Sequence, residues 1–130
     1  NDGNMLKPSL EYQEEKQGEA WLEGVFSPEH VKAIMEGLIG AVNDPNGTGY
    51  ALRRDDILLA GKTGTAEIKD SQEDTEGTEI GWFCSFTAEK EAEKPIMLIS
   101  MVENVKDLGG SGYVVGKDKA VLEQYFEREE

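Results

Sequence analysis

The sequence predicts an α+β fold in which helices flank a three-stranded antiparallel sheet, within one chain of 130 residues. Apolar residues recur at helical spacing over 28–42, and again in the tail from residue 114. Between them, three strand-like runs follow one another over 57–68, 80–87 and 96–102. Because short loops separate these runs, we expect them to pair as a meander.

The composition is acidic, with 13 Lys and Arg against 27 Asp and Glu, a net charge of -14. This charge, with no run of basic residues, disfavours nucleic acid and anionic membrane surfaces as partners. One Cys and one His cannot form an internal disulfide or a structural zinc site, so we expect neither a metal nor a cofactor. The chain starts without Met, and we expect it to be a piece of a longer polypeptide.

The first 24 residues show no sustained apolar period, and the polar run 11–16 interrupts them, so they predict an extended surface segment. A helix should follow, with Ser27 as its N-cap and Pro28 at its first position. It should end near 43–47, at a proline and glycine. Its predicted buried stripe consists of Val31, Ile34, Met35, Leu38, Ile39 and Val42.

The second and third strand-like runs differ in pattern. In the second, Cys84 alternates with apolar neighbours, which predicts a buried core thiol. The third begins with the continuous apolar run 96–99, which suits a strand covered on both faces, so we expect helices on both sides of the sheet. The tail helix should bury Val114, Val121, Leu122, Tyr125 and Phe126.

Two binding motifs can be set aside. The acidic stretch 70–79 has Thr75 where a calcium-binding EF-hand loop needs glycine, and it predicts a solvated hairpin loop. The Gly-Lys-Thr of residues 61–63 has Asp56 where a phosphate-binding P-loop needs its first glycine. A strand is therefore the better interpretation of 61–67.

As a strand, this segment presents groups suited to a carboxylate. Alternation places Thr63 and Thr65 on one face and Lys62 and Gly64 on the other. At a sheet edge, such a strand accepts an extended substrate, while Gly64 leaves room and the next backbone N–H donates to an oxyanion. The alternative is an ordinary edge strand with an exposed lysine, and by itself Lys-Thr-Gly does not decide between them.

A longer stretch of the sequence is more specific than Lys-Thr-Gly alone. GKTGTAEIK at 61–69, followed by IGWFCSF at 80–86, resembles the C-terminal part of the transpeptidase domain of penicillin-binding proteins. The resemblance covers nearly the whole chain and looks closest to class B enzymes, among them the low-affinity methicillin-resistance type. It implies the α+β transpeptidase (β-lactamase-like) fold, with 1–130 as the C-terminal part of that domain.

The resemblance also implies roles for the motif. Lys62 would assist proton transfer, and Thr63 and Thr65 would bind the carboxylate of penicillin or of a D-Ala-D-Ala stem peptide. The Thr65 N–H would form half of the oxyanion hole, and Gly64 would give clearance. The catalytic residues would thus be Lys62 and Thr65, and the substrate-binding residues Thr63, Gly64 and Thr65.

The family's other two motifs, Ser-x-x-Lys and Ser-x-Asn, do not occur in this sequence. Acyl transfer needs an activated nucleophile, so the chain alone should be inactive. His30, early in the first helix, is expected to be a surface or capping residue. The intact protein would cross-link peptidoglycan and bind β-lactams at the extracytoplasmic face of the bacterial membrane. Without a neighbouring strand, the edge of the third strand is expected to favour self-association.

Two other functions remain open at this stage. A β-lactam sensor or class D β-lactamase shares Lys-Thr-Gly, although its sequence continues differently after the motif. A non-catalytic module would use the edge near Thr63 and Thr65 to hold a carboxylate or a peptide.

Overall fold

The computed structural model describes residues 2–10, 18–74 and 76–127. The chain divides into two compact units, Asn1–Gly37 and Leu38–Glu130, and each is described by itself. We call them the N-terminal unit and the C-terminal unit. None of the described helices is both long enough and apolar enough to cross a membrane.

The N-terminal unit contains a small ribbon of two antiparallel strands, β1 (Met5–Leu6) and β2 (Ala20–Leu22). The two strands are extended and mostly exposed, in line with the predicted extended surface segment, but their pairing is regular structure that the sequence did not predict. Strands of two and three residues are too short to show an alternating pattern in the sequence. The polar run 11–16 lies outside the described residues.

Helix α1 (Pro28–Asn43) starts and ends where the sequence predicts. The Ser27 hydroxyl accepts the His30 backbone N–H at 3.3 Å, which confirms the N-cap. The predicted apolar stripe is only partly covered, because Ile34 is 46% exposed whereas Val42 is fully buried. The last residues of α1, from Leu38 onward, belong to the C-terminal unit.

The C-terminal unit is built on a sheet of β3 (Leu59–Ile68), β4 (Thr78–Thr87) and β5 (Met97–Val102). Its strand order is β3-β4-β5 and both pairs are antiparallel, which confirms the predicted meander. The register sets Thr63 opposite Phe83, and Phe83 opposite Ser100.

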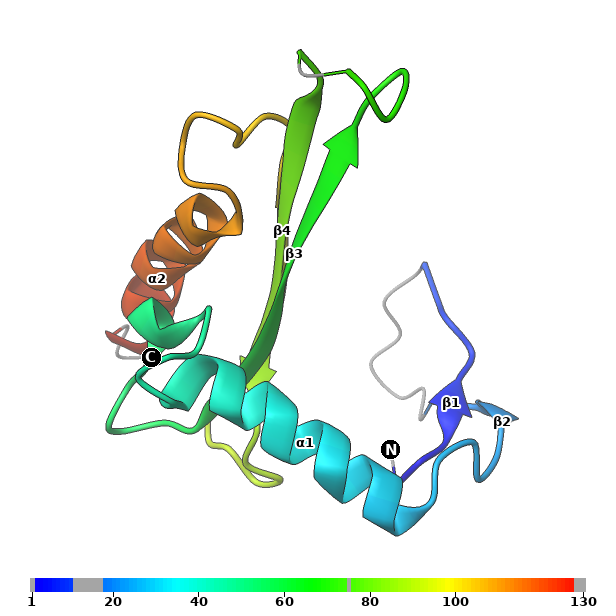
Figure 1. Ribbon diagram of the computed structural model, residues 1–130. Helices are drawn as coiled ribbons and strands as arrows, with labels where there is room; N and C mark the ends of the chain where they lie inside the picture. Colours follow the sequence, from blue (N-terminus) through cyan, green and yellow to red (C-terminus); the bar gives the residue numbers. More distant parts are fainter. Residues whose placement is uncertain (1, 11–17, 75, 128–130) are drawn as a thin grey trace. The chain divides into compact units, whose positions relative to one another are not determined.

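Helix α2 (Ser111–Glu127) packs against all three strands and against the 3₁₀ helix η1 (Tyr50–Leu52). Figure 1 shows α2 beside β4. The core beneath this helix is a cluster of buried side chains from α1, η1, the sheet, the loop between β5 and α2, and α2 itself: Val42, Leu52, Leu59, Phe83, Val105, Val114, Val115 and Leu122. The predicted face of α2 is wrong at one position, since Val121 is 51% exposed.

Asp118 takes an interior position on α2 and is only 2% exposed. One of its carboxylate oxygens accepts the Ser100 hydroxyl at 2.6 Å. The other has no hydrogen-bond partner among the described residues. Burial raises the pKa of Asp118, and the hydrogen bond from Ser100 partly opposes this shift.

The sheet face opposite α2 is not covered in the same way. Trp82, Met97, Ile99 and Met101 on this face are 42% to 63% exposed. The expectation that the third strand is covered on both faces is therefore wrong for β5, whose residues alternate between exposed and half-buried. Cys84 also lies on this face and is half-buried, not a core thiol as predicted.

Candidate functional site

The candidate site is the middle of β3, which forms one edge of the sheet. The Leu59 carbonyl accepts the Asn43 side-chain amide at 2.8 Å, so it points away from β4. Along a strand, backbone groups alternate in direction every residue. The N–H and C=O groups of Gly61, Thr63 and Thr65 therefore also point toward the open edge.

The two threonines share one face but differ in environment. Thr63 and Thr65 lie opposite Phe83 and Gly81, both buried on the side of α2, which agrees with the predicted alternation. Thr63 is 8% exposed, and its hydroxyl oxygen lies 2.9 Å from that of Thr48. Thr65 is exposed. Thr65 thus lies at an exposed position of the strand, while the Thr63 hydroxyl already has a protein partner.

Lys62 and Gly64 occupy the other face, as the alternation predicts. The Lys62 side chain is exposed, and its ammonium donates to the Thr63 carbonyl at 2.6 Å. A Cβ atom built on Gly64 would meet only the Cβ of Trp82, at 3.4 Å, among the described atoms within 4 Å. The structure thus combines a cation, an exposed hydroxyl, an outward backbone N–H and free space along one short stretch.

This combination can bind an anion at the end of an extended chain. An ionised carboxylate accepts hydrogen bonds only, and the site offers donors of three kinds: an ammonium, hydroxyls and an N–H. The free edge offers backbone pairing to a substrate strand. The described side chains that surround the motif include no activated serine, so binding and polarisation are what this stretch supplies.

Sequence reasoning missed the support behind the motif. Asn43 contacts β3 from the end of α1, and Thr48 contacts it from the loop that follows. By itself, the Gly-Thr-Gly of residues 47–49 predicts only a connection between the helix and the first strand of the sheet. Two glycines flanking a hydroxyl residue are the available signal, but only the tertiary structure shows what the hydroxyl contacts.

The loop between β3 and β4 organises itself through Asp74. Its carboxylate accepts the backbone N–H groups of Asp70, Glu76 and Gly77 at 2.8 to 3.2 Å. These hydrogen bonds lower the pKa of Asp74, chiefly those from Glu76 and Asp70. Among the described residues, no group of three or more His, Cys, Asp or Glu side chains is placed to hold a metal ion.

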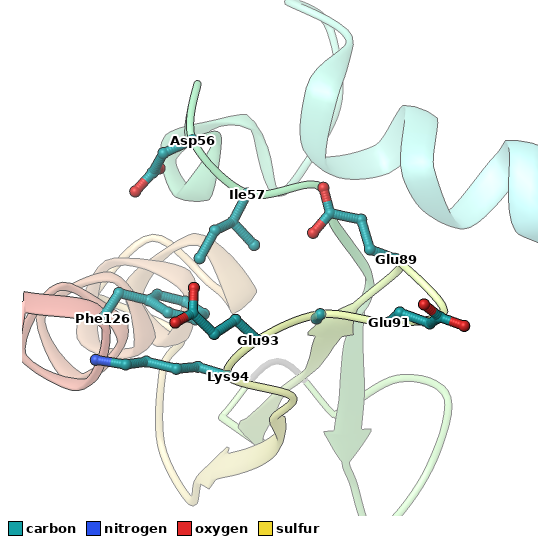
Figure 2. A pocket seen from close by; sticks show the side chains of 8 residues that line it. Asp56, Ile57, Glu89, Glu91, Glu93, Lys94 and Phe126 are labelled. Atoms are coloured by element: carbon teal, nitrogen blue, oxygen red, sulfur yellow. The ribbon is translucent and has the colours of Figure 1, made fainter. Parts of the chain in front are cut away.

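A separate hollow of about 490 Å³ lies where β3 begins and β4 ends (Figure 2). Most of the side chains that line it are charged, four of them acidic and one basic: Asp56, Glu89, Glu91, Glu93 and Lys94. The rest of the lining is Ile57, Ala92 and Phe126. Such a negative surface repels carboxylates. The stretch from Lys62 to Thr65 therefore remains the better candidate for binding a carboxylate.

Comparison with known proteins shows the family to which the chain belongs. The family model described as "Penicillin binding protein transpeptidase domain" matches residues 1–124. The chain is 40% identical over 119 residues to penicillin-binding protein 3 of Bacillus subtilis strain 168, covering 92% of the chain. The match spans 17% of that protein's length.

Two solved structures share the fold. The transpeptidase domain of Burkholderia pseudomallei penicillin-binding protein 3 in its apo form has a TM-score of 0.62 at 16% identity, over 95% of this chain and 38% of that one. Penicillin-binding protein 2B of Streptococcus pneumoniae strain R6 has a TM-score of 0.57 at 16% identity, over 88% of this chain and 19% of that one. The predicted α+β transpeptidase fold is confirmed, and the chain belongs to the penicillin-binding protein transpeptidase domain family.

Proposed function

We propose that residues 1–130 are the C-terminal part of a peptidoglycan D,D-transpeptidase, and that β3 forms one wall of its acyl-transfer site. The observation that carries the proposal is the open edge at Thr65. An outward N–H, the clearance at Gly64 and the exposed Thr65 hydroxyl occur together there, beside an exposed lysine.

The substrate is a stem peptide ending in D-Ala-D-Ala. It lies along β3 as an added strand, and its terminal carboxylate accepts hydrogen bonds from the Thr63 and Thr65 hydroxyls. The carbonyl to be attacked points at the Thr65 N–H, which stabilises negative charge on the oxygen as it develops. Gly64 keeps side-chain atoms away from this approach, since a Cβ there would project into space that is otherwise open.

Lys62 contributes charge and proton transfer. Its ammonium donates to the Thr63 carbonyl at 2.6 Å, on the strand that carries the carboxylate-binding hydroxyls. From this position it strengthens the field that attracts the carboxylate. In the complete site it hydrogen-bonds the serine hydroxyl of the family's Ser-x-Asn motif.

The nucleophile comes from outside these residues. A serine of a Ser-x-x-Lys motif attacks the penultimate D-Ala carbonyl and releases the last D-Ala, and an amine of a second stem peptide then takes the acyl group. β-Lactams acylate the same serine by opening their ring. Since neither serine motif occurs in the sequence, the 130-residue chain alone is inactive.

Location and self-association belong to the same proposal. The enzyme works at the extracytoplasmic face of the bacterial membrane, held by an anchor outside these residues.

When the chain is isolated, the free edge of β5 and the apolar face with Met97 and Ile99 favour association between copies. Size-exclusion chromatography across a range of concentrations tests this, and a concentration-independent monomer would contradict it.

Labelling with a fluorescent penicillin tests the enzyme proposal. The longer protein that contains this chain should be labelled covalently, and the 130-residue chain should not. Lys62→Ala should slow labelling by about tenfold or more, as expected for a lost charged group in a reacting site. Lys119→Ala is the matched control, because Lys119 is an exposed lysine on α2, 51% accessible, outside the motif.

Three results would count against the enzyme proposal. Labelling of the isolated chain would show that the nucleophile lies within it. Failure of the longer protein to label would favour a non-catalytic carboxylate-binding module. Rapid hydrolysis of the acyl-enzyme would favour a class D β-lactamase.

A further inference from the structure

We infer that Thr48 is a positioning residue for Thr63, donating its hydroxyl hydrogen to the Thr63 oxygen so that the Thr63 hydrogen is directed to the substrate carboxylate. The inference rests on the proposed function, because it assigns Thr63 a carboxylate partner. Its structural basis is the 2.9 Å contact between the two hydroxyl oxygens.

The loop that carries Thr48 is held against the end of α1. The Gly47 N–H donates to the Asp44 carbonyl and the Gly49 N–H to the Ala41 carbonyl, both at 2.8 Å. A Cβ built on Gly47 would lie 2.4 Å from the Ala41 carbonyl oxygen, so only glycine fits this approach. The backbone on both sides of Thr48 is therefore fixed by hydrogen bonds and close packing.

The same loop is also held against β3. A Cβ on Gly49 would lie 3.3 Å from the Phe83 ring, and one on Gly61 would lie 3.0 Å from it, so the ring packs closely against both glycines. The Asn43 amide donates to the Ile39 carbonyl at 2.9 Å and to the Leu59 carbonyl at 2.8 Å, which joins α1 to the start of β3. The loop that carries Thr48 is thus held in place by hydrogen bonds and packing where its hydroxyl contacts Thr63.

Hydrogen-bond chemistry then selects a direction. A threonine hydroxyl has one hydrogen and two acceptor positions. If Thr63 donates to Thr48, no hydrogen remains for a carboxylate, which itself only accepts. If Thr48 donates to Thr63, the Thr63 hydrogen is available, and the accepted bond fixes its orientation. A hydrogen bond from Thr63 to a carboxylate therefore requires Thr48 to be the donor in the pair.

Thr48→Val tests this, because valine keeps the branched shape and loses the hydroxyl. The measurement is the second-order rate of acylation of the longer protein by benzylpenicillin and by its methyl ester, which lacks the free carboxylate. Weakening one hydrogen bond to a charged group should slow acylation by benzylpenicillin about tenfold and leave the ester rate unchanged. Thr48→Ser should restore the wild-type rate.

Thr78→Val is the matched control, since Thr78 is an exposed threonine on β4 outside the site and should change neither rate. If Thr48→Val slows acylation by both ligands equally, the role of Thr48 is purely structural and the inference is overturned. The inference is also overturned if neither acylation rate changes. If Thr48→Val does not fold, as judged by thermal melting, the smaller Thr48→Ala decides by the same comparison. Failure of the wild-type protein to be acylated would instead refute the proposed function.

Discussion

Two glycines on β3, Gly61 and Gly64, should respond oppositely to the same substitution. A Cβ on Gly61 would lie 2.7 Å from the Cys84 carbonyl oxygen and 3.0 Å from the Phe83 ring, in the interior. A Cβ on Gly64 would meet only the Trp82 Cβ at 3.4 Å, an ordinary contact, among the described atoms within 4 Å. We therefore expect Gly61→Ala to be destabilising and Gly64→Ala to be tolerated by the fold.

The magnitudes follow from two opposing effects. Overpacking at Gly61 costs about 1–3 kcal/mol of the free energy of unfolding. Replacing glycine by alanine also restricts the unfolded chain and returns about 0.4–1 kcal/mol. Gly61→Ala should thus lose about 1–2 kcal/mol, and Gly64→Ala should be unchanged or gain up to about 1 kcal/mol. For a domain near 100 residues, the two melting temperatures should differ by about 4 °C or more.

Urea and thermal denaturation, followed by tryptophan fluorescence, measure the two stabilities. In the longer protein, penicillin labelling gives the functional comparison. Gly64→Ala should abolish labelling of a folded protein, whereas Gly61→Ala should reduce it only as far as the folded fraction falls. Equal destabilisation by both substitutions, or the reverse order, would refute the steric reasoning. Full labelling of Gly64→Ala would refute the clearance role.

Three further predictions concern the core and the buried polar groups. Phe83→Ala should lower the free energy of unfolding by about 3–5 kcal/mol in urea titrations, because a ring only 1% exposed leaves a cavity; a loss under about 1 kcal/mol would contradict the packing. Burial raises the pKa of Asp118, so the folded state holds its proton more tightly. The contribution of this group to stability is fully present below its ordinary pKa of 3.8 and is lost as pH rises through the folded pKa. Asp118→Asn should remove the loss of stability that ionisation of Asp118 causes between pH 4 and pH 7. If the difference in stability between these two pH values is the same in the variant, the role given to Asp118 is wrong. Burial, with a contribution from Asp118, also raises the pKa of the Cys84 thiol, so iodoacetamide at neutral pH should modify it more slowly than an unhindered cysteine until urea is added.

The sheet was predictable because its signals are local. Each strand carries a β-compatible run, and the loops between strands are short, so neighbours in sequence become neighbours in the sheet. The start of α1 was equally readable, since Ser27 caps the helix through its own hydroxyl. The alternation of Lys62, Thr63, Gly64 and Thr65 follows from strand geometry alone.

The parts that the sequence did not reveal depend on tertiary contacts. Asp118 is a residue type expected on the surface, and only its contact with Ser100 across the helix–sheet interface accommodates it inside. Val121 shows the opposite case, because its apolar side chain was expected to be buried and is 51% exposed. Thr48 meets Thr63 across 15 positions of sequence, and no local pattern reports such a pairing.

The meander also has a consequence for the order in which the chain folds. All pairing in the sheet is between strands joined by loops of 69–77 and 88–96, and such local contacts form quickly. Phe83, however, is buried in the same cluster as Val114 and Leu122 of α2. A chain that has paired its three strands but has not yet packed α2 therefore holds a formed sheet whose core side is exposed to water. Aggregation competes with folding during that interval.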